Sequence, residues 1–282
     1  MLKKTLKIEF RKVFSSKLFF LALVVGICLA GTQVIHVREY VDWVKEGSNQ
    51  IHPSGFDSES LLINWLGMDN RTAIGMVFYL ALPILAAMPF GSSYFTERKS
   101  GYYMQVTMRS GQKTYLCAKW IAAFVSGVMV IMIPLTLNLM ANALVCPLGK
   151  VHILSLTVYV GQEYFASKLF YENPILYIVM GLVLSSVWGG ICAVVSLTAG
   201  MFLKNKILII ISPLIVLEFA GLVLLYLKSC TNFTYFEVRP MELMRSICLN
   251  PNPTWYVISY MLLFLALIII VYWKRGMKSE GI

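Results

Sequence analysis

Long uninterrupted apolar runs, separated by polar connectors, set the pattern of this chain. Each run is near or above the roughly 20 residues that a helix needs to cross the hydrocarbon of a bilayer. Because the runs are continuous rather than alternating, they indicate helices and not the strands of a barrel. The six predicted spans are Leu18–Ile35, Ala73–Phe95, Trp120–Cys146, Pro174–Phe202, Ile207–Leu227 and Trp255–Trp273. We therefore predict an all-α integral membrane protein, with one six-helix transmembrane domain over residues 18–282.

The polar connectors predict how the chain lies across the membrane. With the N-terminus inside, the inner segments hold 15 Lys and Arg residues and the outer segments hold 8. Cytoplasmic connectors are enriched in these residues, so both termini are expected in the cytoplasm. This distribution also accounts for the net charge of +10 better than a nucleic-acid-binding surface does. The outer segments are then 36–72, 147–173 and 228–254.

Composition supports the membrane assignment. The chain is 58% hydrophobic and 13% charged, whereas about 25% of the residues in a soluble domain are charged. The six cysteines show neither a CxxC pair nor metal-ligand spacing. Cys230 and Cys248 share an outer segment, where they form either a disulfide or two partly buried thiols.

Residues 1–17 precede the first span and are strongly basic. On a helix, most of the lysines and arginines fall opposite one apolar face, formed by Leu2, Leu6, Phe10, Val13 and Phe14. This pattern predicts an amphipathic helix lying in the inner leaflet, with its basic residues toward anionic headgroups. The alternative is an ordinary positive flank of the first span.

The connector from Thr96 to Lys119 is the most informative segment. It is basic, lies between two apolar runs, and has room for a helix of about two turns between Gly101 and Gly111. A helix this short is not stable alone in water and must dock on something. We therefore expect a partner protein on the cytoplasmic side.

Polar side chains inside the spans are the candidates for a translocation path. Glu218 lies near the middle of the fifth span, where a carboxylate is costly unless it is paired or neutral. Asn138 and Asn142 lie one turn apart on the third span, with Thr136 nearby. They are interpreted as partners of Glu218 or as the wall of one path. The alternatives are a protonated packing residue for Glu218 and hydrogen bonds between helices for the asparagines.

Signatures of an enzyme are scarce. The sequence has no HExxH zinc pair, no GxSxG elbow and no complete phosphate-binding loop. His52 and Asp57 match an HxxxxD spacing that occurs often by chance. The chain is therefore expected not to be an enzyme by itself and to bind no cofactor. The alternative is a membrane enzyme or sensor that uses the outer segment 36–72.

Four features together resemble the permease subunits of type-2 ABC exporters (the ABC-2 family). They are the amphipathic helix that leads into the first span, the six-span layout, the loop from Glu97 through Gly101 into a short helix Tyr102–Met108, and Lys119 at the start of the third span. The usual leucine-rich helix followed by Pro is replaced here by Tyr, Met and Val followed by Arg109 and Ser110.

The resemblance implies half of a transporter in a cell membrane of bacterial type. Two permease subunits, identical or related, would pair with two cytoplasmic ATPase subunits that bind ATP and Mg. ATP-driven closure of the ATPases would push on the coupling helix and export an amphipathic or hydrophobic substrate, such as an antimicrobial peptide, a drug or a lipid-like molecule. On this chain the docking face is expected at Tyr102, Tyr103, Met104 and Met108, with Glu97, Arg98, Gly101 and Arg109 around it. Anchoring at the membrane interface is the alternative role for these side chains.

Overall fold

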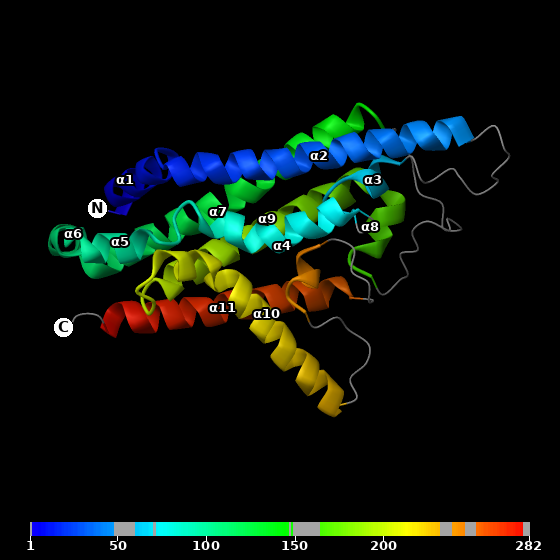
Figure 1. Ribbon diagram of the computed structural model, residues 1–282. Helices are drawn as coiled ribbons and strands as arrows, with labels where there is room; N and C mark the ends of the chain where they lie inside the picture. The colour runs from blue at the N-terminus through cyan, green and yellow to red at the C-terminus, as the bar shows by residue number, and fades with distance from the viewer. Residues whose placement is uncertain are drawn as a thin grey trace.

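The computed structural model describes residues 2–47, 60–69, 72–146, 148, 164–231, 239–245 and 252–278. Within these ranges all regular structure is helical, as predicted (Figure 1). The elements are α1 (Leu2–Phe14), α2 (Lys17–Gly47), α3 (Leu61–Asn64), α4 (Ala73–Ala87), α5 (Ser93–Lys99), α6 (Tyr102–Ser110), α7 (Gln112–Ala143), α8 (Ser167–Glu172), α9 (Pro174–Ala199), α10 (Lys206–Thr231), the 3₁₀ turn η1 (Glu242–Met244) and α11 (Thr254–Lys278).

Five of the described helices are long and apolar enough to cross a membrane: α2, α7, α9, α10 and α11. The second predicted span, Ala73–Phe95, is not one continuous helix. Its helix α4 ends at Ala87, the chain turns through Pro89 and Gly91, and α5 resumes at Ser93. A Cβ on Gly91 would lie 2.1 Å from the Ser196 hydroxyl of α9, so this turn lies directly against the neighbouring helix. The apolar composition therefore predicted the length of the run but not the break within it.

Two helices extend well past their predicted ends. α2 continues through the polar residues after Ile35 as far as Gly47, so the first helix is much longer than the predicted span. α7 begins at Gln112, directly after the short helix α6, and not at Trp120. Hydropathy detects only the membrane-immersed part of a helix, whereas backbone hydrogen bonds continue it into the polar region.

The centre of the bundle is the contact between α7 and α9. Gly127 and Gly189 allow the two backbones to approach closely: a Cβ on Gly127 would lie 2.5 Å from the Gly189 carbonyl oxygen. At the next residue of α9, a Cβ on Gly190 would lie 2.7 Å from the Phe124 ring of α7. Small residues at a helix contact are a common way to pack membrane helices. Gly189 and Gly190 of α9 thus allow close packing within the bundle.

The segment 60–69 lies inside the bundle rather than at its surface. Trp65 is fully buried, and its indole Nε1 donates a hydrogen bond to the Leu135 carbonyl of α7 at 3.2 Å. The residues Asn64–Gly67 of the predicted outer segment 36–72 are therefore part of the packed bundle. The buried backbone is satisfied by polar side chains of α7, which hydropathy does not reveal.

One end of the bundle gathers the elements expected to be cytoplasmic. Figure 1 shows α1, α5, α6, the connector between α9 and α10, and the last turns of α11 toward the same end. α10 contacts α9 near this connector, where the Ser196 hydroxyl donates to the Ile209 carbonyl at 2.7 Å. Farther along, α10 runs obliquely away from α11 (Figure 1).

Candidate coupling site

The short helix α6 lies between two glycines with positive φ. Gly101 has φ 75° and ψ −4°, and Gly111 has φ 80° and ψ 145°. Neither conformation is readily adopted by residues that carry a Cβ. The glycines therefore fix the two sharp turns that connect α5 to α6 and α6 to α7.

The inner side of α6 is held by aromatic contacts. Tyr103 is buried, and its ring packs edge-on against Tyr94 of α5 and Tyr115 of α7, with centroids 5.7 and 5.4 Å away. The Gln112 amide donates to the Tyr103 hydroxyl at 3.2 Å and to the Gly276 carbonyl of α11 at 2.7 Å. These contacts supply the docking that a helix of this length needs for stability.

The outer side of α6 is open. Met104 and Met108 are 54% and 81% exposed, and Arg109 is exposed beside them. Arg98 and Gly101 are exposed at the preceding turn. Of the residues predicted to dock a partner, Tyr103 and Glu97 point inward, whereas Met104, Met108, Arg98 and Arg109 are exposed.

Directly beneath α6 lies a group of four charged side chains, here called the ionic cluster: Glu9, Lys12, Glu97 and Lys119. Lys119 is fully buried, and its Nζ lies 3.0 Å from Glu9 Oε2 and 2.9 Å from Glu97 Oε1. Lys12 Nζ donates to Glu9 Oε1 and to Glu97 Oε1, both at 2.8 Å. Two lysines and two carboxylates make the cluster neutral overall, and it joins α1, α5 and α7.

The environment of Glu97 favours its charged form. Burial alone raises the pKa of the carboxyl, but the positive charge of Lys119 opposes this effect. Hydrogen bonds from Lys12, at 2.8 Å, and from the Tyr115 hydroxyl, at 2.6 Å, stabilise the carboxylate further. The pKa of Glu97 therefore lies below its ordinary value. Glu97 thus carries a negative charge at neutral pH despite its position.

The helix α1 is present as predicted, but the face that it turns toward the bundle is not the predicted apolar face. Thr5, Glu9 and Val13 face the bundle, while Leu2 and Phe14 are 40% exposed. Lys12 was expected to point toward headgroups and is instead half-buried in the ionic cluster. The reason is that Lys119 presents a buried positive charge to α1, and Glu9 on the facing surface of α1 compensates it together with Glu97 of α5.

Two contacts connect α6 to the ionic cluster. Lys12 Nζ lies 4.2 Å above the centre of the Tyr102 ring, a cation–π arrangement. Tyr103 packs on Tyr115, whose hydroxyl donates to Glu97. The first turn of α6 therefore contacts α1 through Tyr102 and α7 through Tyr103.

The asparagines of α7 belong to a second polar group at the other end of the bundle. Asn138 Nδ2 donates to Gln33 Oε1 at 2.8 Å, and Asn142 Nδ2 donates to the same oxygen at 3.1 Å. Asn138 Oδ1 also accepts the Leu66 backbone N–H at 3.0 Å. The two residues thus join α2, α7 and the segment 60–69. Thr136 is separate from them, since its hydroxyl bonds to carbonyls of its own helix.

Glu218 is not brought together with these asparagines. It is exposed on α10 and lines a pocket of about 390 Å³ between α4, α10 and the segment 239–245 that contains η1. Arg239 and Arg245 line the same pocket, and the Arg245 guanidinium lies 4.9 Å from the centre of the Tyr79 ring. The carboxylate at the middle of α10 thus shares a pocket with two arginines and a second carboxylate, Glu242, none of which was predicted to lie near it.

Glu9 and Gln33 were also missed, although each leaves a trace in the sequence. Glu9 is the acid of the strongly basic helix α1, and Gln33 is an amide near the end of an apolar run. His52, Asp57 and Cys248 lie outside the described residues. Among the residues that the structure does describe, no group of three or more His, Cys, Asp or Glu side chains is arranged to hold a metal ion.

Comparison with protein-family models, with curated proteins and with solved structures finds no match.

Proposed function

We propose that this chain is the membrane subunit of an ATP-driven exporter of the ABC-2 type. Its substrate would be an amphipathic or hydrophobic molecule, and ATP hydrolysis would take place on separate cytoplasmic subunits. The proposal keeps six membrane crossings, with residues 73–95, that is α4 and the turn that follows it, forming the second, and with Glu97 on the cytoplasmic side of this crossing. Both termini then lie in the cytoplasm.

The observation that supports this function best is the two-sided character of α6. Its inner side is fixed to α5, α7 and α11 by Tyr103 and Gln112. Its outer side presents two exposed methionines flanked by Arg98 and Arg109. Methionine and arginine are enriched where proteins meet, and methionine adapts to an irregular partner surface. A purely membrane-anchoring helix would have no need of such a rigid inner attachment.

The ionic cluster supplies a route for force from α6 into the membrane. A push on α6 reaches Lys12 through Tyr102, and it reaches Glu97 through Tyr103 and Tyr115. The cluster holds α1, α5 and α7 by short charge-assisted contacts, which are stronger and more directional than neutral ones. A displacement of α6 would therefore move these helices together.

The position of Glu218 supports a transporter assembled from two membrane subunits. A carboxylate midway along a spanning helix is not stable against lipid and needs water, a partner or a cavity. Glu218 is exposed on a single chain and opens into a pocket with Arg239 and Arg245. A second permease subunit facing α10 would remove this side chain from lipid and enclose a polar path.

The test is co-purification of an ATPase. The chain is expressed together with its neighbouring genes, extracted in mild detergent, and its partners are identified by mass spectrometry. The Met104→Glu and Met108→Glu variants are compared with Lys113→Glu, which changes an exposed residue at the start of α7. An ATPase that binds the wild type and the Lys113 variant, but neither methionine variant, is the expected result.

The absence of an ATPase from a folded, monodisperse wild-type sample would overturn the proposal. Binding that survives both methionine substitutions would overturn the docking face and leave the exporter assignment to be tested by transport. Thermal unfolding of each variant shows whether a loss of binding is simply a loss of folding.

A further inference from the structure

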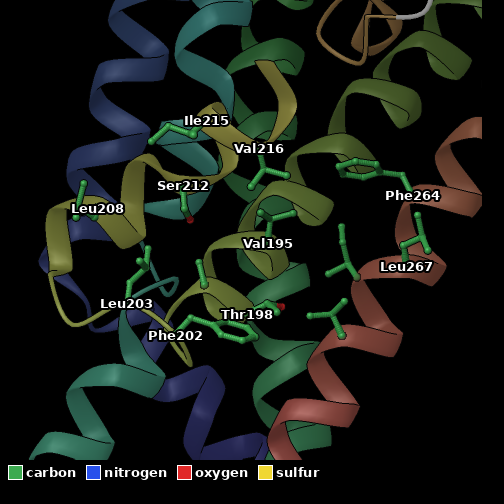
Figure 2. A pocket seen from close by; sticks show the side chains of 13 residues that line it. Val195, Thr198, Phe202, Leu203, Leu208, Ser212, Ile215, Val216, Phe264 and Leu267 are labelled. Carbon is green, nitrogen blue, oxygen red and sulfur yellow. The ribbon is translucent and has the colours of Figure 1, made fainter. Parts of the chain in front are cut away.

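An apolar groove opens between α9, α10 and α11, on the half of these helices near the termini. Its volume is about 560 Å³, within the range of binding sites for small molecules. Figure 2 shows Val195 and Thr198 of α9, Val216 of α10 and Phe264 and Leu267 of α11 around one space.

The side chains that line the groove offer no free hydrogen-bond donor to a ligand. Its two hydroxyl groups are already satisfied: Thr198 donates to the Val194 carbonyl at 2.8 Å, and Ser212 donates to the Ile209 carbonyl at 2.7 Å. The remaining lining residues are aliphatic or aromatic. The groove therefore suits a hydrocarbon chain and not a polar solute.

The rim of the groove is basic. The Arg275 guanidinium lies 5.1 Å from the centre of the Phe202 ring, and Phe202 lines the groove. Lys204 is exposed in the connector from α9 to α10, which also supplies the lining residue Leu203, and Lys206 is exposed at the first position of α10. This places three positive charges close to one apolar opening.

The acidic residues near this end are occupied elsewhere. Among the described residues, Glu9 and Glu97 are the carboxylates at this end of the bundle, and both pair with Lys12 and Lys119 in the ionic cluster. None of the ion pairs within the described part of the chain includes Arg275, Lys204 or Lys206. Their charge is thus available to a ligand.

We propose that this groove binds an anionic phospholipid of the inner leaflet. One acyl chain would lie between α9, α10 and α11, and the phosphate would face Arg275, Lys204 and Lys206. Hydrocarbon contact alone gives little preference, because lipid tails are as apolar as the lining. Selection would therefore come from the headgroup, and basic pockets between membrane helices on the cytoplasmic side are suited to acidic lipids.

This lipid site is separate from the candidate translocation path. Glu218 lines a different pocket, farther along α10 and bordered by α4. The groove residues of α10 are Leu208, Ser212, Ile215 and Val216, in its first half. Bound lipid would fill the space between α10 and α11 and so stabilise the oblique position of α10.

The experiment uses the full chain in nanodiscs of phosphatidylcholine and phosphatidylglycerol. Trace amounts of either lipid carry a photoactivatable diazirine on one acyl chain, and the labelled peptides are mapped by mass spectrometry. The expected result is labelling of peptides around Val195 and Leu267. The phosphatidylglycerol probe should label them at least about fivefold more than the phosphatidylcholine probe, as expected for one or more basic residues at a membrane surface.

Two kinds of variant test the groove and its rim separately. The triple variant Arg275→Gln, Lys204→Gln and Lys206→Gln should bring the ratio of phosphatidylglycerol to phosphatidylcholine labelling close to one. Lys113→Gln, at the same end of the bundle, should leave this ratio at the wild-type value. Ala199→Trp, inside the groove, should abolish labelling there, whereas Val183→Trp on a lipid-facing part of α9 should not.

Three results would overturn the proposal. The first is equal labelling by both probes in the wild type, and the second is no labelling of the groove in discs that contain folded protein. The third is that two copies of the Leu267→Cys variant form a disulfide with each other and the probe no longer labels the groove. The last result would show that a second copy of the chain covers the groove.

Discussion

Lys119 Nζ and Glu9 Oε2 lie 3.0 Å apart, with the lysine side chain fully buried and the glutamate side chain 1% exposed. This pair joins the start of α7 to the amphipathic helix α1. Taking two charges out of water is costly, and only their close mutual contact and further partners offset that cost. The pair is therefore a point at which a single substitution has a large effect.

We predict that Lys119→Met destabilises the protein strongly. Loss of one partner from a buried pair leaves an uncompensated charge and typically costs about 3–5 kcal/mol. Thermal unfolding in detergent measures this as a fall in the midpoint, and Lys113→Met, at an exposed position of the same helix, should leave the midpoint almost unchanged. Adding Glu9→Gln to Lys119→Met should recover part of the loss. Strictly additive effects of the two substitutions would show that Glu9 and Lys119 do not interact.

The sequence predicted the class of fold because membrane helices are specified by long apolar runs, and five of the described helices meet that criterion. It did not predict the break after Ala87, because Pro89 and Gly91 stop a helix only where a neighbour accepts the turn. Here α9 provides Ser196 directly against Gly91. Information of this kind lies in the packing of distant segments and not in local composition.

The acid sensitivity of the protein is expected to depend on Glu97. Its pKa is lowered in the folded state, so its contribution to stability is present above its ordinary value of 4.5 and is lost as the pH falls through the lower folded value. Unfolding midpoints measured between pH 7 and pH 3 test this for the wild type and for Glu97→Gln. The wild type should be the more stable at neutral pH, and the difference should shrink below pH 4.5. A difference that stays constant down to pH 3 would contradict the role given to this carboxylate.

The candidate coupling site was only partly predictable. Gly101 and Gly111 mark the ends of α6 in the sequence because both positions need backbone conformations that favour glycine. The exposed pair Met104 and Met108 follows from helical spacing. That Glu97 points inward follows from Lys119 and Lys12, which come from α7 and α1. A single local motif cannot reveal a cluster to which three separated segments contribute.

The two glycines that flank α6 are expected to tolerate different substitutions. A Cβ at either position would meet no atom within 4 Å, so the effect of a substitution comes from the backbone alone. Gly101 is in the left-handed helical region, which asparagine tolerates, whereas Gly111 combines φ 80° with ψ 145°, which is nearly restricted to glycine. Alanine should therefore cost about 1–2 kcal/mol at Gly101, and asparagine should recover most of it.

At Gly111, asparagine should be no better than alanine, and both should cost on the order of 1–3 kcal/mol. Unfolding midpoints of the four single variants provide the comparison. Recovery by asparagine at both positions would show that the turn after α6 adopts an ordinary left-handed conformation.

Substitutions of Asn138 and Thr136 distinguish a structural role of these side chains from a role in transport. Asn138 joins Ala30, Gln33 and Leu66 through its amide, while the Thr136 hydroxyl bonds only within α7 in the contacts described. Asn138→Ala leaves buried polar groups without partners and should cost about 1–3 kcal/mol, whereas Thr136→Ala should change stability by less than about 0.5 kcal/mol. Unfolding midpoints and transport rates are measured on the same samples. Both variants could instead keep wild-type stability and alter which substrates are exported. That result would show that the two side chains line the path, and it would contradict the structural role that the hydrogen bonds around Gln33 indicate.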